Sequence, residues 1–381
     1  MKTRGGIVES KSVWRRCFIF AQRGTRFPMF SKDQYELLDF GNGRRLERFG
    51  ALVLDRLCPS AEGRAPASPE RWREADAKFL PFPTSSKSAK NSALGIRGYW
   101  VPTSDLGRRY FPSYRDASEA EKASNSNANL PWLLPVGARF VFELKGSPFG
   151  HVGVFPEQAE NWARIFAFCR QGAETLGRPL KILNLFGYTG GSALAADASG
   201  AEVTHLDAAR NIVAQAKRNA ALSNALRAKL ERGAALDFSE EELVLGGNVR
   251  WIVDDATKFV KRELKREARY DGIILDPPSY GHGARGEVWR LTRDLAPMLD
   301  RCAALCGGEV GFVMLTCHTP SFNGQALERA LRDSFEKTAF RRTVRYLSRS
   351  IGIRSNAGRT LPSGDLALAT FGVDPSARPF C

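Results

Sequence analysis

Four stretches of the sequence place glycines or carboxylates directly after predicted strands. The first is a glycine-containing turn at residues 187–191, and the others end in Asp207, in Asp254 and Asp255, and in Asp276. Glycines let a backbone approach a ligand closely, and the helix that follows offers free N–H donors. An acid about one strand–helix unit later can accept both hydroxyls of a ribose. A single acid in such a place is commonly a helix cap, but the combination indicates a site for a nucleoside-containing ligand.

The stretch around Asp276 separates two classes of enzyme. A dinucleotide-dependent dehydrogenase would account for the glycine turn and for Asp207, although the turn does not have G-x-G-x-x-G spacing. It does not account for Asp276 followed by Pro277 and Pro278, which force a rigid, extended exit from the strand. The stretch around Asp276 therefore indicates an enzyme class other than the dehydrogenases.

Strand and helix patterns alternate strictly after residue 180. Strands are predicted at 181–186, 201–207, 251–254, 272–276 and 309–316, with helices at 190–200, 208–224, 288–305 and 324–339. This alternation predicts an α/β fold with a Rossmann-like, doubly wound, mostly parallel sheet. Ligands of such sheets bind beyond the carboxyl ends of the strands, where all four stretches lie.

Together these motifs resemble a known family of enzymes. LNLFGYTGG (183–191), HLDAA (205–209), VDDA (253–256) and LDPPSY (275–280) resemble bacterial ribosomal RNA large-subunit methyltransferases of the cytosine-C5 (type I) group and their guanine-N7 relatives. HVGVFPEQ (151–158) is similar to the G-x-F-x-x-Q element that helps enclose the cofactor in this group. The resemblance spans roughly residues 140 to 373. It implies a class I methyltransferase fold that uses S-adenosylmethionine (SAM).

The resemblance also implies roles for individual residues. The cofactor would contact Phe155, Gln158, Asn184, Phe186, Tyr188, Thr189, Gly190, Asp207, Asp255 and Asp276. Asp207 would bind the ribose, Asp255 the adenine edge, and Asp276 would lie near the sulfonium. Pro277, Pro278 and Tyr280 would shape the pocket for the target base, and no metal ion is expected. Two features depart from the family pattern: Asn184 stands where many methyltransferases carry an acid, and the N-terminal RNA-binding module of the type I enzymes is not evident.

Cys317 follows the predicted strand 309–316 at its carboxyl end. Methylation of a pyrimidine C5 needs covalent activation: a thiolate adds to C6, C5 attacks the methyl group, and a base removes the C5 proton before the thiol departs. The resembling cytosine-C5 enzymes carry their nucleophile in a Thr-Cys pair at this strand end. The resemblance therefore implies methylation of cytosine C5 in large-subunit ribosomal RNA, with Cys317 as nucleophile and Asp276 as the group that handles the proton. His282 could orient the substrate or act as a base.

The alternative is that Cys317 fills the core, as Cys302 and Cys306 are expected to do. The same scaffold could then methylate a guanine nitrogen, which needs only positioning and desolvation. A third possibility is a non-enzymatic RNA-binding protein with a degenerate cofactor domain, but the complete series of acids favours an enzyme.

The charge balance favours a nucleic-acid partner. The chain has 381 residues, with 56 Lys and Arg against 41 Asp and Glu, a formal net charge of +15. Such an excess attracts polyanions, and basic residues gather at 258–269 and 341–359. RNA, and ribosomal RNA in particular, is the expected partner.

The remaining features concern compartment and organisation. The seven cysteines are odd in number and lack C-x-x-C spacing, which disfavours disulfide frameworks and zinc sites. No apolar stretch approaches the ~18 residues of a membrane span, so we expect a cytoplasmic protein without membrane contact. We expect a basic tail at 1–30, a small β-containing region with long loops at 31–139, and the methyltransferase domain at 140–381. Within these, short strands are predicted at 35–57, a β-meander at 139–158 and a helix at 158–176.

Overall fold

The computed structural model describes residues 30–83, 96–113, 118–119, 132–137, 139–232, 247–283, 286–338, 340 and 342–374, without the side chain of His282. The basic segment 1–29 lies outside the described residues.

The larger part of the fold is a seven-stranded sheet. Its order is β10 (Val249–Val253), β9 (Glu202–Asp207), β8 (Lys181–Leu185), β11 (Gly272–Leu275), β14 (Gly311–Cys317), β16 (Thr360–Phe371) and β15 (Arg345–Arg354). The first five are parallel, whereas β16 pairs antiparallel with both β14 and β15. The predicted Rossmann-like, mostly parallel sheet is confirmed. The basic stretch at 341–359 contains all of β15.

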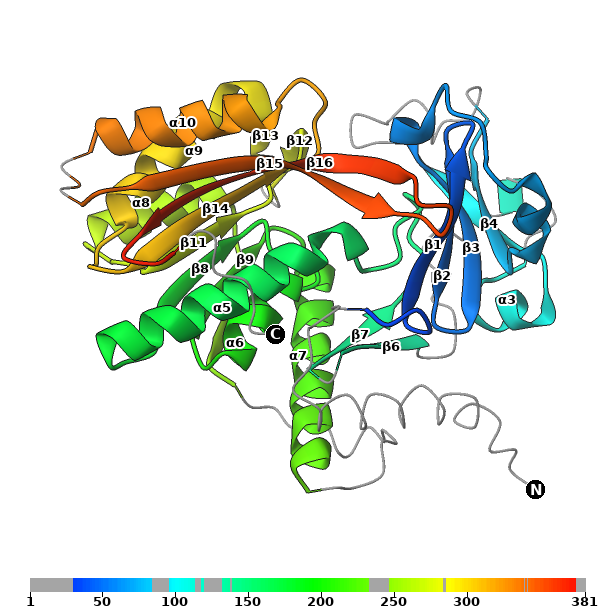
Figure 1. The fold of residues 1–381 in the computed structure, drawn as a ribbon, viewed down its shortest axis with the longest axis horizontal. Coiled ribbons are helices and arrows are strands. Elements are labelled where there is room, and N and C mark those ends of the chain that lie inside the picture. Colours follow the sequence, from blue (N-terminus) through cyan, green and yellow to red (C-terminus); the bar gives the residue numbers. More distant parts are fainter. Residues whose placement is uncertain are drawn as a thin grey trace.

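Helices cover both faces of this sheet (Figure 1). On one face lie α5 (Ala159–Leu176), α6 (Gly191–Ala198) and α7 (Arg210–Glu231); on the other lie α8 (Ala256–Lys265), α9 (Leu291–Leu305) and α10 (Gly324–Glu336). Because both faces are covered, alternate residues of each central strand enter different apolar clusters. In β14, for example, Phe312 packs on the α5 side, whereas Val313 packs on the α9 side.

The N-terminal region forms a second sheet. Its five strands follow the chain order: β1 (Tyr35–Gly41), β2 (Arg44–Phe49), β3 (Leu52–Leu57), β4 (Ala77–Pro81) and β5 (Gly98–Pro102). The β1–β2 turn places Asn42 and Gly43 at φ values of 50° and 70°, as a tight hairpin requires. Helix α3 (Asp105–Tyr110) follows β5, and a hairpin of β6 (Trp132–Val136) and β7 (Phe140–Leu144) leads into the larger part. Trp100, Phe111 and Trp132 are buried in the core of this region.

Three predicted elements differ from the structure. The long-loop region 59–129 contains β4, β5 and α3. The predicted meander at 139–158 has one strand, β7; beyond it the chain turns at Gly150 and Gly153, which have positive φ, and reaches a short 3-10 helix, η4 (Pro156–Gln158). The helix predicted at 288–305 begins at Leu291. The three residues before it form β13 (Val288–Arg290), which pairs with β12 (Tyr280–His282).

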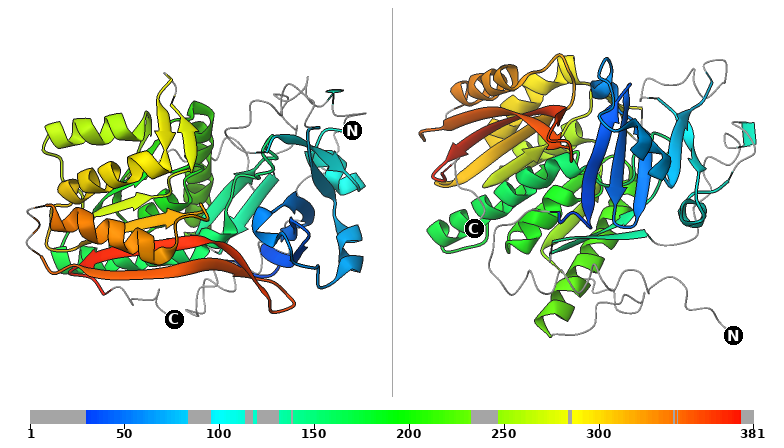
Figure 2. Two further views of the ribbon diagram at one scale, coloured as in Figure 1. Left: turned by 90° about the horizontal axis from the view of Figure 1, so that it is seen from above. Right: turned by 45° about the vertical axis from the view of Figure 1, so that its right-hand side comes forward.

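The β15–β16 hairpin joins the two sheets (Figures 1 and 2). Leu361 packs against Leu37 and Phe40 of β1. Arg359 donates through Nη2 to Asp39 Oδ1 at 3.0 Å and to the Phe40 carbonyl at 2.6 Å. The hairpin therefore belongs to both cores.

Candidate active site

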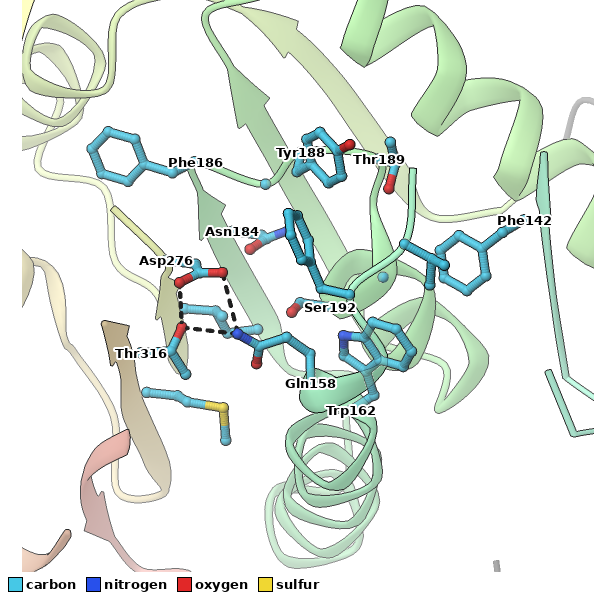
Figure 3. A pocket seen from close by; sticks show the side chains of 16 residues that line it. Phe142, Gln158, Trp162, Asn184, Phe186, Tyr188, Thr189, Ser192, Asp276 and Thr316 are labelled. Atoms are coloured by element: carbon cyan, nitrogen blue, oxygen red, sulfur yellow. Dashed lines mark hydrogen bonds between the residues drawn. The ribbon is translucent and has the colours of Figure 1, made fainter. Parts of the chain in front are cut away.

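A pocket of about 490 Å³, including its open mouth, lies where β8 and β11 end (Figure 3). These strands are neighbours, and the helices that follow them, α6 and α9, cover opposite faces of the sheet, so the pocket occupies the point where the winding reverses. Its lining residues are Phe142, Val154, Phe155, Gln158, Trp162, Asn184, Phe186, Gly187, Tyr188, Thr189, Gly191, Ser192, Ile274, Asp276, Met314 and Thr316.

The turn after β8 is held in one conformation. Phe186 and Tyr188 have φ values of 56° and 48°, in the left-handed region that side chains other than glycine rarely adopt. Thr189 Oγ1 donates to the Gly153 carbonyl at 2.6 Å. A Cβ on Gly187 would lie 2.4 Å from Cε1 of the fully buried His205. Glycine is therefore required at 187 by close packing.

Asp207 braces this turn from the end of β9. Its Oδ2 accepts from the Tyr188 backbone N–H at 3.0 Å, and its Oδ1 accepts from that of Ala209 at 2.9 Å. Burial raises the pKa of Asp207, and the backbone donors offset part of that rise. The carboxylate thus lies beside the turn at 187–191, where a residue that binds a ribose would be needed. Asp207 is not among the residues that line the pocket.

A hydrogen-bonded polar group surrounds Asp276 (Figure 3). Asp276 accepts from Thr316 Oγ1 at 2.7 Å and from Gln158 Nε2 at 3.2 Å, and His318 Nε2 lies 3.4 Å from its Oδ1. Burial opposes ionisation, but these partners, His318 foremost, hold the pKa of Asp276 below its ordinary value. Conversely, and despite burial, Asp276 is the main cause that raises the pKa of His318 to about 9. The pair is an ionised carboxylate beside an imidazolium at neutral pH.

Strand β14 presents Thr316 to the pocket and turns Cys317 the other way. Met314 and Thr316 line the pocket, whereas Leu315 and Cys317 belong to the apolar cluster on the α9 and α10 side. Cys317 is 1% exposed, and burial raises the pKa of its thiol. Its Sγ accepts from the Thr319 backbone N–H at 3.5 Å. The predicted nucleophile is therefore outside the pocket lining.

Most other predicted cofactor residues gather in the pocket. Those that line it are Phe155, Gln158, Asn184, Phe186, Tyr188, Thr189 and Asp276, and Gly190 adjoins them with φ 95°. Asp255 caps α8 by accepting from the Lys258 backbone N–H at 2.8 Å, and Asp254 pairs with Arg262. Pro277, Pro278 and Tyr280 follow Asp276 but are not in the lining. Cys302 and Cys306 are buried in the core, as predicted.

Several lining residues were missed by the sequence analysis. Trp162 lies in α5, four residues after Gln158, which caps the start of that helix, and this spacing lets both side chains face the same pocket. Thr316 is one residue before Cys317, and only the strand's orientation decides between them. Phe142 comes from β7 and carries no motif.

The donors and acceptors of the pocket fit SAM. Gly191 lines the pocket and packs closely against Trp162, because a Cβ on Gly191 would lie 2.5 Å from that ring. An ionised Asp276 suits a sulfonium, and Ser192 at the start of α6 suits a carboxylate. Within the described ranges, no group of three or more His, Cys, Asp or Glu side chains could hold a metal ion. Over those same residues, no helix is long and apolar enough to cross a bilayer.

Known proteins share this fold and these motifs. A crystal structure of the SAM-dependent methyltransferase from Agrobacterium tumefaciens superposes with a TM-score of 0.65 and 30% sequence identity, over 88% of this chain and 90% of that one. The ribosomal RNA large subunit methyltransferase K/L of Shewanella sp. (strain MR-4) is 33% identical over 145 residues, 37% of this chain and 18% of the relative. That of Alteromonas mediterranea is 26% identical over 281 residues, 73% of this chain and 33% of the relative.

The chain thus spans 18% and 33% of the lengths of these two curated relatives. No protein-family model matches it. The similarity to these curated relatives confirms the resemblance to ribosomal RNA large-subunit methyltransferases. The match to the Agrobacterium structure covers most of both chains and establishes the broader family. By fold, by pocket and by this match, the chain belongs to the SAM-dependent methyltransferases.

Proposed function

We propose that this chain transfers a methyl group from SAM to a base of RNA, with large-subunit ribosomal RNA as the substrate. The observation that carries the proposal is the pocket itself. It joins the glycine turn at 187–191 to the ionised Asp276 at the end of β11. The names of the curated relatives and the formal charge of +15 support RNA as the substrate.

A bound SAM would supply an electrophilic methyl group, and the residues of the chain would position it. Asp207 and the 187–191 turn would hold the nucleoside and methionine parts. Asp276 stays ionised and is oriented by Thr316 and Gln158, so it can accept a hydrogen bond from an amino group that presents its lone pair. Trp162 and Phe142 give the pocket an apolar wall that excludes water.

The geometry supports a guanine nitrogen as the target atom better than cytosine C5. A nitrogen lone pair attacks the methyl carbon directly, so no enzyme nucleophile is needed. The C5 route depends on the Cys317 thiolate, but that thiol is buried on the opposite side of β14 from Thr316 and its pKa is raised. Cytosine C5, the target implied by the resemblance, is the second candidate, because Cys317 lies next to Thr316 at the carboxyl end of β14.

The test is methyl transfer from labelled SAM to transcribed, unmodified large-subunit ribosomal RNA, with nucleoside analysis of the product. We expect the wild type and Cys317→Ala to label the same guanosine at similar rates, and Asp276→Asn to label it much more slowly. Formation of 5-methylcytidine by the wild type but not by Cys317→Ala would establish the covalent route instead. Cofactor binding without RNA labelling would refute RNA as the substrate.

A further inference from the structure

The ribbon formed by β12 and β13 rises directly from the segment that follows Asp276. It was not expected from the sequence, which predicted a helix at 288–305 and no element at 280–282. Its central residue, Trp289, is 7% exposed, although the ribbon is only three residues long on each side. This indole is buried by contacts with residues outside the ribbon, among them Pro278 and Phe186.

Trp289 and Leu291 hold the segment Pro277–Ser279 through two backbone carbonyl groups of that segment. Proline has no backbone N–H, so Pro277 and Pro278 cannot donate hydrogen bonds to their surroundings. The indole N–H of Trp289 donates to the Pro278 carbonyl at 2.7 Å, and the Leu291 backbone N–H donates to the Ser279 carbonyl at 3.0 Å. These two donors come from β13 and from the start of α9, so the ribbon sets the peptide planes after Asp276.

The ring of Trp289 also contacts the cofactor turn. Its centroid lies 4.9 Å from that of Phe186, with the ring planes at 55°. Phe186 lines the pocket and has a left-handed φ of 56°, a conformation that is strained for a bulky side chain. Such strain persists only when neighbouring groups over-determine it, and the indole ring is one of those groups.

We infer that Trp289 is a positioning residue that couples the two halves of the site: its N–H sets the Pro278 carbonyl on the substrate side, and its ring sets Phe186 on the cofactor side. The inference rests on the proposed function for its substrate half. Because the two contacts use different parts of one side chain, they can be separated by substitution. Phenylalanine keeps a ring beside Phe186 but loses the donor, and alanine loses both.

The experiment uses the full chain and measures two quantities for each variant. These are the SAM dissociation constant by calorimetry, and kcat/KM for transcribed large-subunit ribosomal RNA. Trp72→Phe is the matched control, because Trp72 also donates its indole N–H, to Asp39 at 3.0 Å, but lies in the N-terminal region. Melting temperatures show whether each variant folds.

For Trp289→Phe we expect a SAM dissociation constant within about twofold of wild type and a kcat/KM for RNA about fivefold lower, from the lost hydrogen bond. For Trp289→Ala we expect SAM binding to weaken about fivefold as well, from the lost aromatic contact. Trp72→Phe should change neither quantity.

An unchanged kcat/KM in Trp289→Phe overturns the substrate half of the inference, and unchanged SAM binding in Trp289→Ala overturns the cofactor half. If Trp289→Ala does not fold, a Trp289→Phe variant that matches Trp72→Phe in both quantities overturns the inference. If the wild type methylates no RNA, the proposed function fails, and the SAM affinities alone decide whether Trp289 positions Phe186.

Discussion

Replacing Gly187 by alanine tests whether close packing fixes the cofactor turn. The added Cβ would lie 2.4 Å from Cε1 and 2.6 Å from Nδ1 of His205, where ordinary contacts begin at 3.4 Å. The overlap is therefore 3.4 − 2.4 = 1.0 Å against a ring that is fully buried and packs 4.8 Å from the Trp251 ring. Gly187 does not have a positive φ, so the effect is steric alone.

Overpacking of this kind costs about 1–3 kcal/mol. If the turn relieves the overlap by leaving its binding conformation, SAM affinity falls by about 5- to 150-fold. Calorimetric titration with SAM measures this loss of affinity directly. Thermal unfolding measures any part of the overpacking energy that instead lowers the stability of the folded protein. Gly200→Ala is the control, because Gly200 has φ 91° but no atom within 4 Å of its Cβ position. It should lower stability by about 1 kcal/mol and leave SAM affinity unchanged.

A double-mutant cycle with His205→Ala identifies the clashing group. Removing the imidazole removes the two nearest contacts and leaves Asn184 Nδ2 at 2.8 Å from the Cβ position, so Gly187→Ala should cost less SAM affinity in that background than in wild type. The reasoning is refuted if Gly187→Ala binds SAM as tightly as wild type. It is refuted equally if the penalty is the same with and without the His205 ring.

Three further predictions concern charged groups. The folded-state pKa of His318 is raised to about 9, so the stabilisation from its pairing with Asp276 is complete below the unfolded pKa of about 6.5 and is lost as pH rises through 9. Melting temperatures should fall more between pH 7 and 9.5 in wild type than in His318→Gln. Asp207→Asn should weaken SAM binding about tenfold or more, because a charged acceptor is lost; an unchanged titration would exclude Asp207 from the site. Arg359→Ala removes donors to Asp39 and Phe40 and should lower stability by about 1–3 kcal/mol in urea unfolding; a change below 0.5 kcal/mol, roughly the effect of an ordinary surface substitution, would contradict the bridging role of the hairpin.

The sequence was most informative where a backbone rule links residue type to place. Strand–helix alternation predicts the parallel sheet, and strand ends predict that Asp207 and Asp276 flank the turn at 187–191. The structure has this sheet, with both acids hydrogen-bonded close to that turn. These predictions need only local patterns and the geometry of parallel strands.

The orientation of Cys317 could not be predicted in the same way. Every residue of β14 is buried, so the strand shows no polar–apolar alternation that would reveal which residues face the pocket. A shift of one residue exchanges Thr316 and Cys317. The packing of α9 and α10 determines which residue faces the pocket. It buries Cys317 on the helix side and leaves Thr316 on the pocket side.

The β12–β13 ribbon was missed because local preference and tertiary contact disagree. The residues from Val288 onward continue into a helical pattern. Val288 and Trp289 are of types common in strands, but three residues are too few to show an alternating pattern. Trp289 is instead drawn to Phe186 and to the Pro278 carbonyl, groups that lie 103 and 11 positions away (289 − 186 and 289 − 278). Contacts of this kind override propensity and are invisible without the fold.

The β15–β16 hairpin sets an order of events during synthesis. Strand β1 leaves the ribosome early, but Leu37 and Phe40 complete their apolar cluster only with Leu361. Asp39 meets Arg359 across a separation of 320 residues. At typical rates of 5–20 residues per second, this interval lasts roughly 15–65 s. Throughout it, the N-terminal sheet exposes part of the surface that later becomes core, so nascent chains that do not yet contain the β15–β16 hairpin should be the species that chaperones and proteases encounter.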